Sequence, residues 1–194
     1  GAGNDNITGN AGTDTIVFGT NLTSADTVDG GAGTDTLTFT DGDSATTDLN
    51  NVTNVETVTL GNATTSVTTV NALVASGQSL AVSAAALTGS NTLTWDGSAE
   101  SDGTFNITGS GQNDTITGGS GNDTIDGAAG NDSITSGAGN DNITGNAGTD
   151  TIVFETNLTS ADTIDGGAGT DTLTFTDGDG CLLYTSPSPR DSFR

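Results

Sequence analysis

Residues 109–153 read GSGQNDTIT-GGSGNDTID-GAAGNDSIT-SGAGNDNIT-GNAGTDTIV, five nine-residue units in unbroken register. The sixth residue of every unit is aspartate, at Asp114, Asp123, Asp132, Asp141 and Asp150, and the eighth is isoleucine, at Ile116, Ile125, Ile134, Ile143 and Ile152. The glycine-rich first six residues can adopt positive φ angles that a β-carbon disfavours, and the last three have the composition of a strand. The spacing therefore predicts a turn and a short strand every nine residues.

The same unit recurs on both sides of this block. After a three-residue insertion at 154–156 the register resumes over 157–174 and places Asp162 and Asp171 at the sixth position. Residues 1–43 repeat residues 137–179 with two differences, at positions 19/155 and 28/164, so a larger period of 136 residues contains the small one. The N-terminal copy supplies four more aspartates at the sixth position: Asp5, Asp14, Asp26 and Asp35.

These units resemble the RTX family, the glycine- and aspartate-rich nonapeptide repeats of bacterial secreted proteins, with consensus G-G-x-G-x-D-x-U-x. The resemblance covers roughly 1–39 and 109–174. It implies an all-β fold, a parallel β-roll or β-solenoid in which two nonapeptides form one coil. Some units depart from the consensus: Gln112, Ser110 and Ala128 replace glycines, and the units at 21–29 and 157–165 lack glycine before their aspartates.

In such a roll, residues eighteen apart lie above one another, at a strand spacing of about 4.8 Å. Asp114, Asp132 and Asp150 then form one column, with Asp123 and Asp141 in the opposite one, and the isoleucines point inward. Two carboxylates about 5 Å apart repel by roughly 3 kcal/mol at an effective dielectric near 20. A column without a cation therefore disfavours folding. A divalent cation between two stacked carboxylates would turn their net repulsion into attraction.

The composition of the chain indicates which divalent cation the aspartate columns would bind. Residues 1–180 carry 24 carboxylates and no cationic side chain, there is no histidine, and the one cysteine, Cys181, lies near the C-terminus. Aspartates and turn carbonyls suit Ca²⁺, which takes six to eight oxygens, whereas zinc prefers nitrogen and sulfur. We expect all eleven sixth-position aspartates to be metal ligands, with ions between Asp114/Asp132, Asp132/Asp150 and Asp123/Asp141. The alternative is an Asx-turn, in which each carboxylate accepts only a local backbone N–H.

Four segments are expected: a truncated calcium-binding roll at 1–40, a β-rich spacer at 41–108, a second roll at 109–180 and a non-native tail at 181–194. The spacer has alternating stretches at 55–60, 92–95 and 104–108 that predict strands, while 80–87 fits a strand or a short helix. Trp95 fits a core position better than a binding face. The tail, which begins CLLYTSPSPRD, resembles a translated sequencing adapter and is expected to be disordered.

The charge and composition of the chain argue against several classes of function. A formal net charge of −23 argues against nucleic acid and anionic membranes as partners, and no apolar run is long enough to cross a membrane. Without histidine or lysine, we expect no catalysis. So acidic a chain could also be disordered, but the strict repeat argues against that. Because the chain opens within a repeat at Gly1, we expect it to be a piece of a longer protein.

Two functions fit. One is a calcium-stiffened segment of a long secreted or cell-surface protein, of the surface-layer or adhesin type, whose partners are other copies of itself or a cell-surface component. The other is a calcium-dependent folding and secretion module attached to an extracellular enzyme such as a lipase or a protease. In both, the resemblance implies an extracellular or bacterial cell-surface location and export through a type I system.

Overall fold

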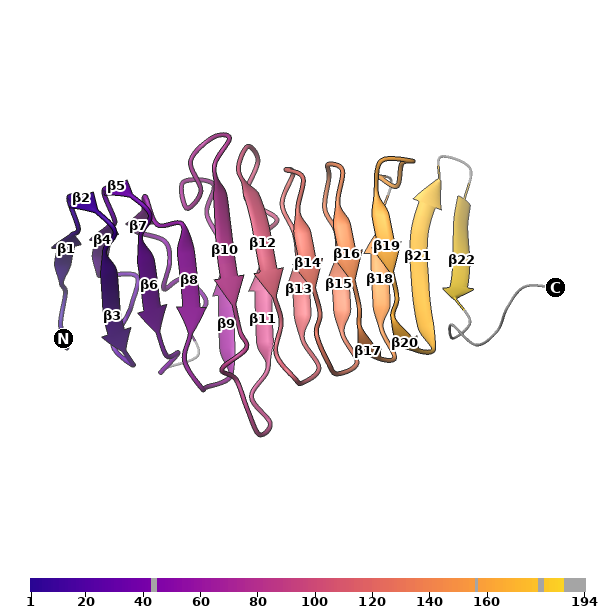
Figure 1. Ribbon diagram of the computed structural model, residues 1–194, viewed down its shortest axis with the longest axis horizontal. Coiled ribbons are helices and arrows are strands. Elements are labelled where there is room, and N and C mark those ends of the chain that lie inside the picture. Colours follow the sequence, from indigo (N-terminus) through magenta and orange to yellow (C-terminus); the bar gives the residue numbers. More distant parts are fainter. Residues whose placement is uncertain (43–44, 156, 178–179, 187–194) are drawn as a thin grey trace.

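The computed structural model of the chain describes residues 1–42, 45–155, 157–177 and 180–186. The chain winds as a solenoid whose successive strands stack side by side, so that the first coils and the last lie at opposite ends of an elongated body (Figure 1). Every strand pairing is parallel except the last one. The predicted all-β parallel solenoid is confirmed. No helix in the described part of the chain is long and apolar enough to cross a membrane.

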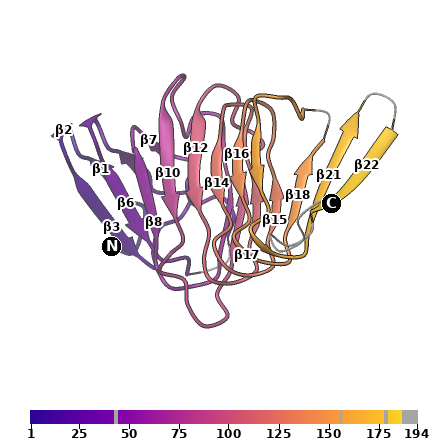
Figure 2. The ribbon, with the colours of Figure 1, turned by 45° about the vertical axis from the view of Figure 1, so that its right-hand side comes forward.

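Two long sheets form the two sides of the solenoid, and the chain crosses from one to the other at each half-coil (Figure 2). The eight-stranded sheet contains β3 (Thr15–Gly19), β6 (Thr36–Phe39), β8 (Thr57–Leu60), β10 (Ser79–Ser83), β12 (Thr104–Thr108), β14 (Thr124–Asp126), β16 (Asn142–Thr144) and β19 (Thr163–Asp165). The seven-stranded sheet contains β9 (Thr65–Thr68), β11 (Leu93–Asp96), β13 (Thr115–Thr117), β15 (Ser133–Thr135), β18 (Thr151–Phe154), β21 (Asp171–Asp177) and β22 (Gly180–Ser186).

Three smaller sheets complete the fold. Near the N-terminus, β1 (Asn6–Thr8), β4 (Thr27–Asp29) and β7 (Val52–Thr53) form a three-stranded sheet. Two glycine-containing turns form two-stranded ladders of their own, one from β2 (Ala11–Gly12) and β5 (Ala32–Gly33), the other from β17 (Ala147–Gly148) and β20 (Ala168–Gly169). The turns therefore stack coil upon coil as the strands do.

A single hydrophobic cluster runs along the inside of the solenoid. In the three-residue nonapeptide strands only the middle residue faces inward, whereas the four-residue β18 buries both Ile152 and Phe154. The five isoleucines of residues 109–153 are at most 1% exposed. Period-2 alternation explains this, because a three-residue strand can direct only its central side chain to one face.

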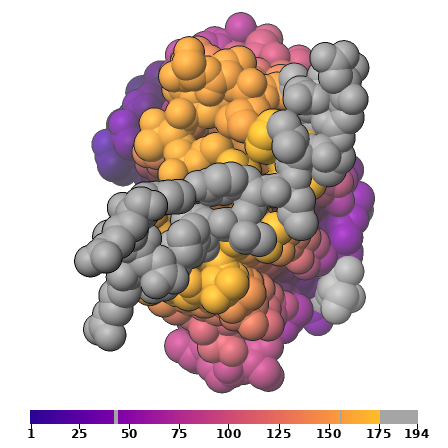
Figure 3. All heavy atoms as spheres, turned by 90° about the vertical axis from the view of Figure 1, so that its right-hand side faces the viewer, coloured from indigo at the N-terminus to yellow at the C-terminus, as the bar shows by residue number. Residues whose placement is uncertain are grey.

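Figure 3 looks along the axis of the solenoid from the end with the last coils, which lie in front of the earlier ones.

The predicted coil length is confirmed where the nonapeptides are strict. Thr115 pairs with Ser133 and Ser133 with Thr151, a step of eighteen residues each time. The next step, from Thr151 to Thr172, takes twenty-one residues and absorbs the insertion at 154–156. Spacer coils are longer still, since Thr57 pairs with Ala81 in the next coil.

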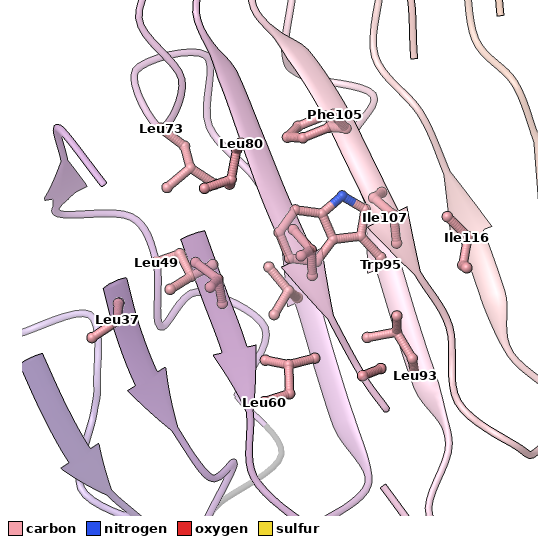
Figure 4. Close-up of a cluster of buried hydrophobic side chains, with 14 of the residues drawn as sticks. Leu37, Leu49, Leu60, Leu73, Leu80, Leu93, Trp95, Phe105, Ile107 and Ile116 are labelled. Atoms are coloured by element: carbon pink, nitrogen blue, oxygen red, sulfur yellow. The ribbon is translucent and has the colours of Figure 1, made fainter. Parts of the chain in front are cut away.

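The spacer continues the same solenoid. The strands predicted at 55–60, 92–95 and 104–108 are confirmed as β8, β11 and β12. The short-helix alternative for 80–87 is wrong: Ser79–Ser83 is β10, and Val82 lies in register between Val58 and Ile107. The prediction that Trp95 is a core residue is confirmed, since it is 1% exposed and meets the ring of Phe105 edge-on at 5.6 Å (Figure 4).

The two copies of the 43-residue segment face opposite sides of the solenoid. Thr15 lies in β3 of the eight-stranded sheet, whereas its copy, Thr151, lies in β18 of the seven-stranded sheet. Leu37 of β6 and its copy Leu173 of β21 are divided between the sheets in the same way. A step of 136 residues therefore advances the chain by a whole number of coils plus one half.

The last described strand departs from the parallel pattern. β22 pairs antiparallel with β21, and Leu173 lies opposite Tyr184. Disorder is predicted for 181–194, but residues 181–186 belong to this strand. The remainder of that prediction, for 187–194, lies outside the described residues.

Candidate calcium-binding columns

The sixth-position aspartates form ladders along the solenoid. All but Asp171 lie directly before a strand, and Asp171 is the first residue of β21. Where another sixth-position aspartate lies one coil earlier, its backbone N–H donates a hydrogen bond to the Oδ1 of the later one. In the first column the N–H groups of Asp114, Asp132 and Asp150 donate to Asp132, Asp150 and Asp171 at 2.8, 2.8 and 3.0 Å. The three pairs predicted to hold ions are therefore neighbours.

The opposite column and the N-terminal copy have the same geometry. The N–H of Asp123 donates to Asp141 at 2.9 Å, and that of Asp141 to Asp162 at 2.7 Å. At the N-terminal end, Asp5 donates to Asp26 at 2.7 Å and Asp14 to Asp35 at 2.8 Å. All eleven predicted residues thus occupy equivalent places in the fold, and in each pair one carboxylate oxygen caps the neighbouring coil.

The second carboxylate oxygen, Oδ2, divides the aspartates into two groups. In the first group Oδ2 is buried and has no hydrogen-bond partner among the described residues: Asp14, Asp35, Asp132, Asp141 and Asp150. A buried oxygen without a donor is unfavourable, and a charged one far more so. These five oxygens are where a cation would be most stabilising.

Four of the five oxygens border a glycine of their own turn, whereas the turn of Asp141 has Ser136 at that place. A β-carbon at Gly127 would lie 2.5 Å from Asp132 Oδ2 and 3.1 Å from the carbonyl oxygen of Gly145. One at Gly145 would lie 2.5 Å from Asp150 Oδ2 and 2.7 Å from the carbonyl oxygen of Gly166. The turn therefore brings a carboxylate oxygen and a carbonyl oxygen of the next coil to the same point.

This donor set fits calcium. No three carboxylates of the described residues cluster closely enough to hold a metal ion through side chains alone. A cation in these turns must therefore take backbone carbonyl oxygens as well, and Ca²⁺ accepts mixed carboxylate and carbonyl ligands at flexible geometry. The turns provide both kinds of oxygen.

In four aspartates of the second roll, burial shifts the carboxyl pKa upward and so favours the protonated form. Burial, and to a smaller extent the charges of Asp114 and Asp150, raise the pKa of Asp132 to about 7. Burial raises the pKa of Asp123 and Asp141 to about 6, and it also raises the pKa of Asp150. Stacked acids in this core hold protons that free aspartates would have lost.

In the second group Oδ2 accepts local hydrogen bonds. Asp26 receives the N–H and hydroxyl of Thr23 at 2.8 and 3.0 Å, and Asp162 receives those of Thr159 at 2.6 and 3.1 Å. Burial alone would raise the pKa of Asp26, but the N–H groups of Asp5 and Thr23 and the Thr23 hydroxyl lower it. In the two units that lack glycine, Oδ2 thus has the contacts of a local turn, while Oδ1 still accepts the N–H of an aspartate one coil earlier.

Two further aspartates also have local partners. The Oδ2 of Asp114 accepts the N–H of Ser110 at 2.6 Å, and that of Asp123 accepts the N–H of Gly119 at 2.7 Å. Both lie where the second roll meets the spacer, and their Oδ1 atoms accept N–H groups of the spacer residues Leu93 and Phe105. Asp5 has another kind of partner, since its Oδ2 lies 3.1 Å from the α-ammonium of Gly1.

Two spacer acids were not singled out from the sequence. Glu56 accepts the N–H of Asp35 at 2.7 Å and so extends a column beyond the nonapeptides. Glu100 is fully buried, and its Oε1 accepts the N–H groups of Asp102 and Gly103 at 3.2 and 3.0 Å, so it anchors its own turn. The signal for Glu56 was its place directly before a strand, which it shares with Asp14 and Asp35.

A stacked parallel solenoid with a ladder of buried aspartates in its turns defines the class of β-roll repeat proteins. The model of the RTX calcium-binding nonapeptide repeat, a unit of four copies, matches residues 1–20, 22–44, 106–134, 129–155 and 158–180. These matches cover more than half of the chain, and the chain belongs to this family. No curated protein and no solved structure gives a significant match.

The raised pKa values predict an unusual pH dependence of thermal stability in metal-free buffer. Because the folded state holds protons up to about pH 6 to 7 at Asp123, Asp132 and Asp141, it binds more protons than the unfolded chain between about pH 4 and 7. Lowering the pH from 8 to 5 should therefore raise the unfolding midpoint. With calcium present, protons compete with the ion, and calcium-dependent stabilisation should shrink over the same window. Thermal unfolding followed by circular dichroism checks both trends, and a metal-free midpoint that falls on acidification would contradict the first.

Proposed function

We propose that the chain binds several Ca²⁺ ions in the turns of its two rolls, through the Oδ2 atoms of Asp14, Asp35, Asp132, Asp141 and Asp150 and neighbouring carbonyl oxygens. The observation that carries this proposal is the set of buried carboxylate oxygens without a donor. In all of these residues except Asp14, the Oδ1 accepts the N–H of an aspartate in the adjacent coil and so holds Oδ2 in the turn. Bound calcium would supply the positive charge that offsets the stacked carboxylates.

We further propose a structural role: a calcium-stiffened segment of a long secreted or cell-surface repeat protein, of the surface-layer or adhesin type, without catalysis. Two observations support it. The acids recur in successive coils rather than converging at one singular place, and the 136-residue duplication lengthens a solenoid without adding to any one site. An extracellular location follows if folding waits for calcium, which is scarce in a bacterial cytoplasm.

Isothermal titration of the metal-free protein with CaCl₂ and, in parallel, with MgCl₂ tests ion binding. Calcium should bind with at least three equivalents and release protons, because the carboxyl groups with raised pKa must ionise. Magnesium should bind much more weakly, since it demands near-ideal octahedral geometry and gives up water reluctantly. Fewer than one equivalent of calcium, or equal binding of both ions, would refute the proposal.

A further inference from the structure

One acid column continues past the nonapeptides into the spacer. Asp14, Asp35 and Glu56 lie directly before β3, β6 and β8, which are neighbours in one sheet (Figure 1). The N–H of Asp35 donates to Glu56 Oε2 at 2.7 Å, just as the N–H of Asp14 donates to Asp35 Oδ1 at 2.8 Å. Glu56 therefore takes the place of an aspartate in the third coil.

The turn that leads to Glu56 is shorter than a nonapeptide turn. The Gly30 N–H donates to the carbonyl of Thr53 as the Gly9 N–H donates to that of Asp29, so Asn54 occupies the place of Gly30 one coil later. Asp35 follows Gly30 by five residues, whereas Glu56 follows Asn54 by two. The additional methylene of glutamate lets its carboxylate reach Asp35 despite the shorter turn.

An unsatisfied oxygen lies at the same point. Asp35 is fully buried, and its Oδ2 has no hydrogen-bond partner among the described residues. A β-carbon at Gly30 would contact both Asp35 Oδ2 and the carbonyl oxygen of Asn54. Asn54 has a φ of 51°, a left-handed conformation that asparagine tolerates better than most residues. The boundary turn therefore provides the carboxylate and carbonyl oxygens that characterise the turns of the rolls.

We propose that one Ca²⁺ ion binds at this boundary, held by Asp35 Oδ2, the Asn54 carbonyl oxygen and the Glu56 carboxylate. The inference rests on the proposed calcium binding of the rolls and assigns to the ion at Asp35 two ligands outside the nonapeptide motif, Asn54 and Glu56. It couples folding of the first spacer coil to the ion. The far end of the spacer differs, because Asp114 and Asp123 meet backbone N–H groups of Leu93 and Phe105 there, each at 2.7 Å.

The variant Glu56→Gln tests the site, because glutamine still accepts the Asp35 N–H but lacks the charge. Glu155→Gln is the matched control: it removes the same charge from an exposed residue after β18. Calcium titration calorimetry should show one equivalent fewer for Glu56→Gln and no change for Glu155→Gln. Hydrogen exchange should show calcium-dependent protection of residues 52–60 reduced at least tenfold, with residues 115–153 unaffected.

A second variant, Glu56→Asp, keeps the charge but shortens the side chain, and it should lose the same equivalent. Protection of residues 115–153 in calcium shows that each variant is folded. If Glu56→Gln retains the full stoichiometry and the protection of 52–60, the boundary site is refuted while calcium binding by the rolls stands. If the parent chain itself binds no calcium, the proposed function fails, and the boundary site fails with it.

Discussion

Replacing Asp132 by asparagine should have opposite effects on stability with and without calcium. In metal-free buffer we expect the variant to be more stable than the parent by about 1–3 kcal/mol, because the substitution removes repulsion between stacked carboxylates. Asparagine still offers an oxygen to the N–H of Asp114, so the backbone ladder is retained. In calcium well above its dissociation constant, the variant should be less stable by about 2–5 kcal/mol, since Asp132 adjoins two candidate sites, each contributing about 2.7 kcal/mol at hundredfold saturation.

Denaturant unfolding of parent and variant, in calcium and in metal-free buffer, measures both effects. Asp102→Asn is the control, because Asp102 is an exposed residue of a spacer turn and loses the same charge. Its stability should change little in either buffer. If Asp132→Asn destabilises the protein equally in both buffers, the carboxylate is a structural cap and not a calcium ligand.

Gly145→Ala should both strain a turn of the second roll and block a candidate calcium site. The new β-carbon would lie 2.5 Å from Asp150 Oδ2 and 2.7 Å from the Gly166 carbonyl oxygen, and the latter belongs to backbone that cannot rotate away. Overpacking of this kind costs about 1–3 kcal/mol, and a blocked calcium site forfeits about 2.7 kcal/mol more at hundredfold saturation. We expect a total loss of about 4–6 kcal/mol in calcium.

Gly111→Ala provides the matched control, because a β-carbon there would have no heavy atom within 4 Å. It should leave stability unchanged or raise it by up to about 1 kcal/mol, by restricting the unfolded chain. Calcium titration of the two variants separates steric strain from loss of a ligand site. Equal calcium stoichiometry in both would show that the space at Gly145 does not hold an ion.

Much of the fold was predictable because the nonapeptide period sets several features at once. A constant aspartate and a constant isoleucine determine where each strand begins, which side chain faces inward, and which residues stack. Asp114 above Asp132, and Ile116 paired with Ile134, follow from that period once two units form a coil. The spacer was harder, since the run at 80–87 has no decisive periodicity until Val82 pairs with its neighbours in the sheet.

The division of the aspartates into two groups was not predictable from their common position. It depends on whether a nearby N–H or hydroxyl reaches Oδ2, as those of Thr23 do for Asp26 and as no group does for Asp132. Glu56 was missed because its turn is too short to match the motif. The opposite orientation of the two 43-residue copies depends on the lengths of the spacer coils, which composition does not reveal.

The proposed dependence of residues 109–174 on calcium rests on the electrostatics of their stacked acids. Amide hydrogen exchange of the whole chain, followed by mass spectrometry in calcium and then in metal-free buffer at pH 7.5, tests it most directly. We predict strong protection of these coils in calcium and its loss when the ion is removed. Equal protection in both buffers would show that the columns hold together without a cation, and would contradict the central claim.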